Sequence, residues 1–292
     1  ACKKKEIMTV ILPLSDSCDV PQLFSSAFRA ATKEATIAQV KQFFDAGCRH
    51  FEIAELFGNG HIICKALGEL CERESVYITY KIWPKSRTEE DMVATVQGQL
   101  KDIGLTYVDL LMTHAPIDVE NKAMQYKALE DLKDMGVTKS CGVINISAVL
   151  LQDLLKNCRI VPVVYGTEVN PFLQCSDMVE FCGDSSIIIM NPEPLAKGIR
   201  DGHAGLNSLA DELGISVTLL MLRWSFTKGL CIGLPAGNAS VTNIIDSEGG
   251  LDDIFVKLSP DIMEKIETFD EGLASVWVPM EPSGDDEENN DQ

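Results

Sequence analysis

The stretch of sequence that decides the fold covers residues 47–67 and reads GCRHFEIAELFGNGHIICKAL. A short apolar run around Ile53 leads into a polar cluster, and a helix-like run follows. Four apolar side chains of that run share one face of a helix: Ile62, Ile63, Ala66 and Leu67. A strand that delivers side chains to the rim of a pocket and returns through a helix has this pattern. The stretch therefore predicts a functional site at the end of a strand.

The same alternation of strand-like and helix-like runs continues along the chain. Strands are expected at 24–28, 50–53, 76–81, 108–113, 140–143, 161–168, 187–190 and 231–234. Helices are expected at 36–46, 62–72, 89–103, 123–135, 150–158, 177–182, 206–213, 218–226 and 261–269. Eight strands that alternate with helices favour an α/β fold, a (β/α)8 TIM barrel, over an open doubly wound sheet.

Both ends of the chain differ from this repeat. Two strand-like runs at 8–12 and 20–24, separated by a polar turn, predict an N-terminal β-hairpin. No linker rich in Pro, Gly or Ser follows, so residues 1–283 are expected to form a single domain. Residues 284–292 are acidic and contain no large apolar side chain, which predicts an acidic disordered tail or an acidic docking tail.

Charge excludes some classes of partner. The net charge is −19 at pH 7, which repels phosphate backbones and anionic lipids. No run approaches the length of a membrane span. We therefore expect neither nucleic acid nor a membrane as a partner, and a cytoplasmic protein.

The cysteines and histidines do not indicate a metal site. The ten cysteines show no Cys-x-x-Cys spacing, and in a chain of this length reduced core thiols are expected. His61 and His203 show no metal-ligand spacing with His50 or with each other. No metal is predicted.

The 47–67 stretch resembles the signature of the aldo-keto reductases. The matching positions are Gly47, Arg49, His50, Ala54, Asn59 and the trio Lys65, Ala66 and Leu67. The resemblance extends over roughly residues 21–273. It implies a barrel whose N-terminal hairpin covers the bottom, a site at the carboxyl ends of the strands, and a C-terminal loop at 273–282 that closes over the substrate.

The resemblance also places four catalytic positions. In this family a hydride moves from nicotinamide to a carbonyl carbon while a Tyr, assisted by Lys and Asp, protonates the oxygen and a His orients the carbonyl. Lys81 and His114 match the family's Lys and His, whereas Glu52 replaces its Asp and Phe57 replaces its catalytic Tyr. Phe57 has the ring but no proton to donate. Because Glu52 can still pair with Lys81, these residues are expected to remain as a polar network in the barrel mouth or to keep a catalytic role.

The family's contacts to NADP are depleted in the same way. Of the residues that hold the nicotinamide amide, the resemblance retains only Asn145. Other residues occupy the positions of the family's Ser, Gln, stacking Tyr, phosphate-binding Lys and phosphate-binding Arg: Ile144, Gly166, Pro192, Ala236 and Thr242. A 2′-phosphate requires cationic side chains or a helix N-terminus. We therefore expect no cofactor, or only weak binding of NADPH or NADH.

Three hypotheses about function follow. The first is an aldo-keto-reductase-like protein that has lost carbonyl reduction and acts as a binding, regulatory or structural subunit of an unknown protein partner. There is a precedent for such a subunit, because the regulatory subunit of glutamate-cysteine ligase resembles this fold without being a reductase. The second is a functional NAD(P)H-dependent aldehyde or ketone oxidoreductase with a non-standard site. The third is other chemistry that uses Glu52, Lys81, His114 and Glu193. The first is our prediction, because the losses affect both the acid and the cofactor contacts; the oligomeric state is not predicted.

Overall fold

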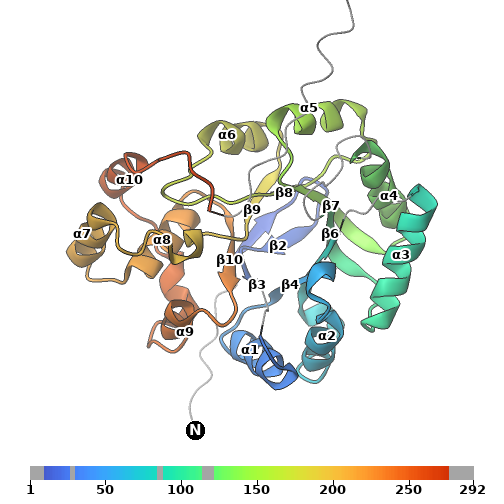
Figure 1. The fold of residues 1–292 in the computed structure, drawn as a ribbon, viewed down its shortest axis with the longest axis horizontal. Coiled ribbons are helices and arrows are strands. Elements are labelled where there is room, and N and C mark those ends of the chain that lie inside the picture. The colour runs from blue at the N-terminus through green and yellow to red at the C-terminus, as the bar shows by residue number, and fades with distance from the viewer. Residues whose placement is uncertain (1–9, 27–29, 84–87, 114–121, 276–292) are drawn as a thin grey trace, which may run out of the picture.

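Eight parallel strands close into a barrel at the centre of the protein (Figure 1). The computed structural model describes residues 10–26, 30–83, 88–113 and 122–275. Around the barrel the strands follow the order β10-β3-β4-β5-β6-β7-β8-β9. Their bounds are β3 (Leu23–Ser26), β4 (His50–Ala54), β5 (Tyr77–Ile82), β6 (Val108–Thr113), β7 (Thr138–Ile144), β8 (Val164–Gly166), β9 (Ile188–Asn191) and β10 (Cys231–Pro235). The predicted (β/α)8 barrel is confirmed.

Helices surround the barrel on its outside (Figure 1). They are α1 (Lys33–Asp45), α2 (Gly60–Gly68), α3 (Glu89–Asp102), α4 (Lys122–Asp134), α5 (Ala148–Asn157), α6 (Ser176–Asp184), α7 (Ala204–Leu213), α8 (Val217–Thr227), α9 (Ala239–Ile245) and α10 (Pro260–Glu267). Side-chain caps fix several starts. Thr32 accepts from the Ala35 amide, which begins α1 three residues before the predicted helix. None of the described helices is by itself long and apolar enough to span a membrane; α7 and α8 pass that test only as a pair bent by 87°.

The predicted N-terminal hairpin consists of β1 (Ile11–Pro13) and β2 (Asp19–Pro21). Leu14 and Val20 pack on the residues inside the barrel, among them Phe24 and Leu110. The hairpin therefore covers the amino-terminal end of the barrel. The run expected as one strand at 20–24 is divided, because the buried Gln22 donates to the Leu230 carbonyl and the barrel strand starts only at Leu23.

One carboxylate attaches the hairpin turn to the barrel. Asp16 Oδ2 accepts from Lys133 Nζ at 2.6 Å and from Ser140 Oγ at 2.8 Å. Burial alone would raise the pKa of Asp16, but the hydrogen bonds from Lys133 and Ser140 outweigh it and hold the pKa below its usual value. This contact fixes the position of the hairpin against β7.

Two apolar layers stabilise the barrel. One lies between strands and helices and includes the fully buried Trp224 of α8, while the other fills the interior with Met112, Ile144 and Met190. The cysteines in the described ranges form no disulfides, and burial raises the pKa of several thiols, that of Cys48 to about 11. Cys48, Cys141, Cys182 and Cys231 are buried core side chains, and the raised pKa leaves their thiols little thiolate at neutral pH.

Candidate active site

Two charged side chains meet at the carboxyl ends of β4 and β5. Lys81 Nζ lies 2.8 Å from Glu52 Oε1, and the two side chains are 7% and 4% exposed. Because β4 and β5 pair in parallel with Ala54 opposite Lys81, the side chains of neighbouring strands are brought together at this edge. The structure therefore places the family's Lys and Asp positions in contact.

Phe57 lies on the segment that directly follows β4. It is the last residue of the short 3-10 helix η1 (Glu55–Phe57), which Gly58 ends in a left-handed conformation at φ 62°. Glu55 Oε2 accepts from the Trp83 amide at 2.8 Å and so attaches η1 to the end of β5. His114, the fourth catalytic position, lies outside the described residues.

No tyrosine replaces the missing phenol. All five tyrosines of the chain lie in the described ranges and serve other parts of the fold: Tyr77, Tyr80, Tyr107, Tyr126 and Tyr165. Tyr80 Oη donates to Gln99 Oε1 and Tyr165 Oη to the Ile146 carbonyl. Tyr77 begins β5 at the opposite end of the barrel, Tyr107 precedes β6 and Tyr126 belongs to α4. Burial raises the pKa of four of these phenols, which disfavours proton release further.

Two of the three nicotinamide-amide positions, Ile144 at the end of β7 and Gly166 at the end of β8, carry no polar side chain. Ile144 is buried, and a Cβ added to Gly166 would lie 2.5 Å from Ile144 Cγ1. The side chain of Ile144 therefore fills the space in which any side chain at 166 would begin. Asn145 follows in a left-handed backbone conformation at φ 51°, and its backbone N–H donates to the Gly166 carbonyl.

The remaining cofactor positions are occupied by residues with structural contacts. Asn191 Oδ1 accepts from the Val169 and Glu193 amides and so holds the backbone on both sides of Pro192. Ala236 donates its amide to the Ser26 carbonyl. Thr242 lies within α9, a helix that sequence analysis missed, and no Lys or Arg occurs between residues 229 and 256.

Sequence analysis also missed a contact that joins the C-terminal segment to β8. Glu168, 4% exposed, accepts from the amide and the hydroxyl of Ser275 and from Asn170 Nδ2. The Glu271 amide donates to the Phe172 carbonyl at 2.9 Å. The segment that contains Glu271 and Ser275 is thus attached at the carboxyl end of the barrel. The remainder of the loop predicted at 273–282 lies outside the described residues.

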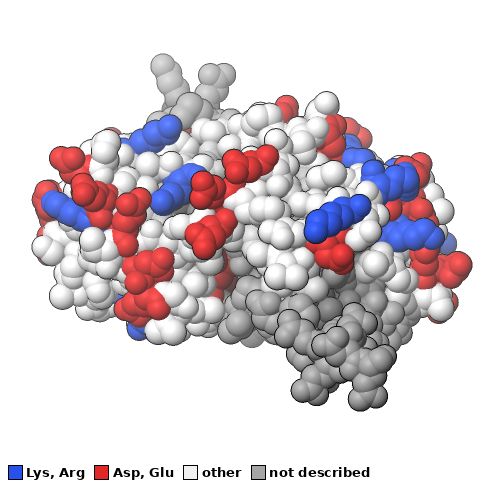
Figure 2. Space-filling view, turned by 90° about the horizontal axis from the view of Figure 1, so that it is seen from above, with Lys and Arg blue, Asp and Glu red and all other residues white. Residues whose placement is uncertain are grey.

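The charge of the surface is mixed. On the face shown in Figure 2, Lys and Arg side chains lie singly or in small groups among Asp and Glu, and no extended basic area is visible. The clusters of His, Cys, Asp or Glu needed to hold a metal ion are absent from the part of the chain that the structure describes.

Comparison with known proteins identifies the family. The sequence profile of the Aldo/keto reductase family matches residues 22–248. The chain is 30% identical over 265 residues to an uncharacterized oxidoreductase of Schizosaccharomyces pombe, covering 88% of this chain and 91% of that protein. It is 31% identical over 227 residues to the NAD(P)H-dependent 6′-deoxychalcone synthase of Glycine max, covering 68% and 70%.

Solved structures agree in fold. The Bombyx mori aldo-keto reductase AKR2E4 in complex with NADP superposes with a TM-score of 0.84 at 22% identity, covering 93% of this chain and 96% of that one. An aldo/keto reductase of Brucella melitensis superposes with a TM-score of 0.81 at 26% identity, covering 90% and 100%. The chain belongs to the aldo/keto reductase family.

Proposed function

We propose that this protein has lost NADPH-dependent carbonyl reduction and acts as a binding, regulatory or structural subunit. The observation that carries the proposal is the absence of a phenol beside Lys81, since each of the five tyrosines lies elsewhere in the described structure. A developing alkoxide needs a donor within hydrogen-bond distance. Phe57 supplies none, and loss of a general acid lowers rates by about 10²- to 10⁴-fold.

The apolar filling at Ile144 supports the same conclusion for the cofactor. A glutamine at 166 would force Ile144 to shift, because its Cβ would lie 2.5 Å from Ile144 Cγ1. The loop after β10 adds no cation for a 2′-phosphate. The position of the general acid follows β4, whereas the cofactor positions lie at or after the ends of β7, β8 and β10. The loss of both is expected if hydride transfer is no longer the function.

Two observations favour the alternative, a functional NAD(P)H-dependent aldehyde or ketone oxidoreductase. The pair of Glu52 and Lys81 is retained in contact, and proteins similar to this chain are named oxidoreductases. The deciding assay follows NADPH and NADH oxidation by the purified protein with a panel of aliphatic and aromatic aldehydes. We expect no turnover above a heat-inactivated control. Turnover that saturates with aldehyde would establish the alternative.

A further inference from the structure

The side chain of His203 caps the start of α7. Its Nδ1 accepts from the Leu206 backbone N–H at 3.2 Å. A backbone N–H can only donate, so this contact needs a lone pair on Nδ1 and places the proton of the neutral ring on Nε2. The other side-chain caps recorded for the described helices are hydroxyls and one amide, which do not titrate near neutral pH: Thr32, Thr88, Ser147, Ser216 and Asn238.

The same ring packs against two phenylalanines from distant parts of the chain. The His203 ring centroid lies 5.0 Å from that of Phe172, between β8 and α6, and 4.8 Å from that of Phe269, which follows α10. Both contacts are edge-to-face, and we call these three rings the aromatic cluster. A Cβ on Gly205 would lie 2.9 Å from the Phe269 ring. The start of α7 is therefore closely packed against Phe269.

The C-terminal segment begins at the aromatic cluster. Residues 270–275 follow Phe269 directly, and residues 270–274 are exposed. The Glu271 backbone N–H donates to the Phe172 carbonyl at 2.9 Å, and the Glu271 carboxylate pairs with Arg200. Because the exposed residues bury little apolar surface, Phe269 is the apolar anchor of the segment.

Protonation of His203 removes the cap. The imidazolium carries a hydrogen on both ring nitrogens, so Nδ1 can no longer accept from Leu206. It also places a positive charge at the N-terminus of α7, where the helix dipole disfavours a cation. Both effects favour rotation of the ring away from the Leu206 N–H. The packing of the ring against Phe269 changes with that rotation.

The charged groups next to the aromatic cluster already have other contacts or are exposed. Arg200 pairs with Glu271, while Glu168 and Asp270 accept from backbone N–H groups. Asp201 is exposed, so water and salt screen its charge. Among the described side chains, these are the charged groups next in sequence to the three rings and the segment: Arg200, Asp201, Glu168, Asp270 and Glu271. None of them restores the acceptor that Leu206 loses.

We propose that His203 is a proton-controlled attachment of the C-terminal segment. The neutral ring caps α7 and holds Phe269, and protonation loosens residues 269–275 from the carboxyl end of the barrel. The segment reaches Glu168 through Ser275, so the proton acts on a part of the chain that lies at the barrel mouth. This inference does not depend on the proposed function.

Nuclear magnetic resonance of the full-length, ¹⁵N-labelled protein tests the cap. The ring nitrogens of His203 should report the neutral Nε2–H form at about pH 8 and the imidazolium at about pH 5.5. The Leu206 and Glu271 amide signals should move with the same midpoint as the ring. A neutral ring protonated on Nδ1, or amide signals that do not follow the ring, would overturn the proposal.

Hydrogen exchange measures the attachment itself. After correction for the intrinsic pH dependence of exchange, the protection of residues 269–275 should fall about fivefold between about pH 8 and pH 5.5, the size expected for loss of a helix cap. Unchanged protection of this segment would contradict the proposal even if the ring titrates.

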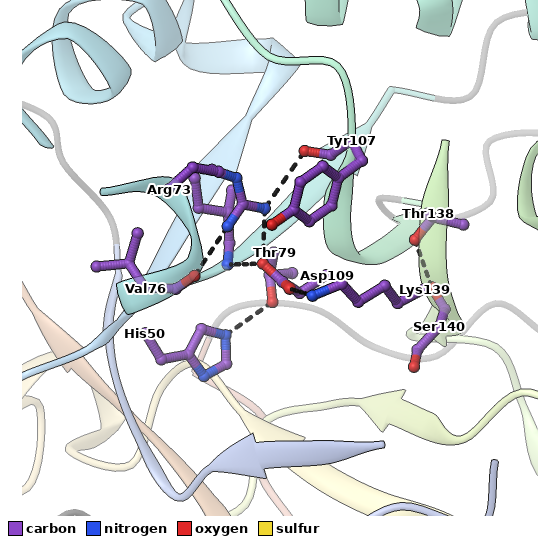
Figure 3. Close-up of polar contacts among 10 residues, drawn as sticks. His50, Arg73, Val76, Thr79, Tyr107, Asp109, Thr138, Lys139 and Ser140 are labelled. Carbon is purple, nitrogen blue, oxygen red and sulfur yellow. Dashed lines mark hydrogen bonds and ion pairs between the residues drawn. The ribbon is translucent and has the colours of Figure 1, made fainter. Parts of the chain in front are cut away.

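The other described histidines lack such a cap. Figure 3 shows His50 directed at Thr79, with 2.7 Å between Nε2 and Oγ1. Burial lowers the pKa of His50 to about 4, so this ring stays neutral over the range of the test. His61 is exposed on α2, a helix whose start has no side-chain cap. His114 lies outside the described residues, so variants are needed to assign the effect.

Two matched variants make this assignment. His203→Asn keeps a capping oxygen but cannot titrate, so the protection of residues 269–275 should be the same at both pH values. His61→Asn should keep the full change of the unmodified protein. A change that persists in His203→Asn, or that disappears in His61→Asn, would assign the effect to another group and overturn the proposal.

Discussion

Lys81 Nζ lies 2.8 Å from Glu52 Oε1, and both side chains are almost completely buried at the carboxyl end of the barrel. Two charges removed from water remain stable together only while each has its partner. The pair therefore has a structural role that does not depend on catalysis.

Removing one partner should cost more stability than removing both. We expect Lys81→Met to lower the free energy of unfolding by about 3–5 kcal/mol, because it leaves the Glu52 carboxylate buried and unpaired. The double variant Glu52→Gln with Lys81→Met should recover most of this loss. Urea denaturation measures both, with Lys41→Met as control.

In that control, the pair of Lys41 and Asp45 is exposed, at 60% and 56%, so its loss should cost less than about 1 kcal/mol. A similarly small loss for Lys81→Met would show that the buried pair contributes little.

Acid should destabilise the protein through His50. Burial lowers the pKa of His50 to about 4 from 6.5, although its contact with the Pro21 carbonyl opposes the shift. Between these values the unfolded chain binds a proton that the folded chain does not, so stability falls as the pH drops from 6.5 towards 4, by up to about 3 kcal/mol.

Urea denaturation of the unmodified protein and of His50→Gln at several pH values checks this assignment. The stability of His50→Gln should approach that of the unmodified protein as the pH falls. The exposed His61 supplies the control, because His61→Gln should keep the pH dependence of the unmodified protein. A constant difference between His50→Gln and the unmodified protein from neutral pH to pH ~4.5 would contradict the assignment to His50.

Ile144 and Gly166 should be energetically coupled. Gly166→Ala forces a methyl group against Ile144 and should cost about 1–3 kcal/mol. Combined with Ile144→Ala, the same change should cost at least about 1 kcal/mol less, since the space is then open. A double-mutant cycle by urea denaturation gives this coupling.

Gly183→Ala is the control, because a Cβ there meets nothing within 4 Å. It should be neutral or stabilising. Strict additivity of Gly166→Ala and Ile144→Ala would mean that Ile144 does not fill the position.

Restoring the phenol alone should not restore reduction. Phe57→Tyr returns a hydroxyl to the loop after β4, but Ile144, Gly166 and the loop after β10 still lack the cofactor contacts. We expect no aldehyde-dependent NADPH oxidation by this variant above that of the unmodified protein. Robust oxidation would show that cofactor binding survives and that only the acid was lost.

The barrel could be predicted because short apolar runs alternate along the chain with segments whose apolar residues recur at helical spacing, and both are local properties of the sequence. The contact of Glu52 with Lys81 was anticipated from the resemblance, which places the two residues at the family's catalytic Asp and Lys positions. Boundaries were less accurate. The strand expected at 161–168 is reduced to Val164–Gly166, and α9 was missed because residues 236–246 were interpreted as a cofactor loop.

Long-range contacts could not be predicted. Glu168 and Ser275 are 107 positions apart, and nothing near either residue indicates the other. A cleft beneath the hairpin is lined by residues of the hairpin and of three barrel strands, β5, β6 and β7, and it forms only when these segments are assembled. Periodicity assigns elements, but it does not identify which polar side chains face one another across the barrel.

The proposed loss of cofactor binding is tested most directly by calorimetric titration of the purified protein with NADPH and with NADH at moderate salt. The Bombyx mori aldo-keto reductase, solved in complex with NADP, is the positive control. We predict no binding stronger than a dissociation constant of about 1 mM, or about −4 kcal/mol. Micromolar binding of either nucleotide, about −8 kcal/mol, would contradict the proposal and favour a functional NAD(P)H-dependent reductase.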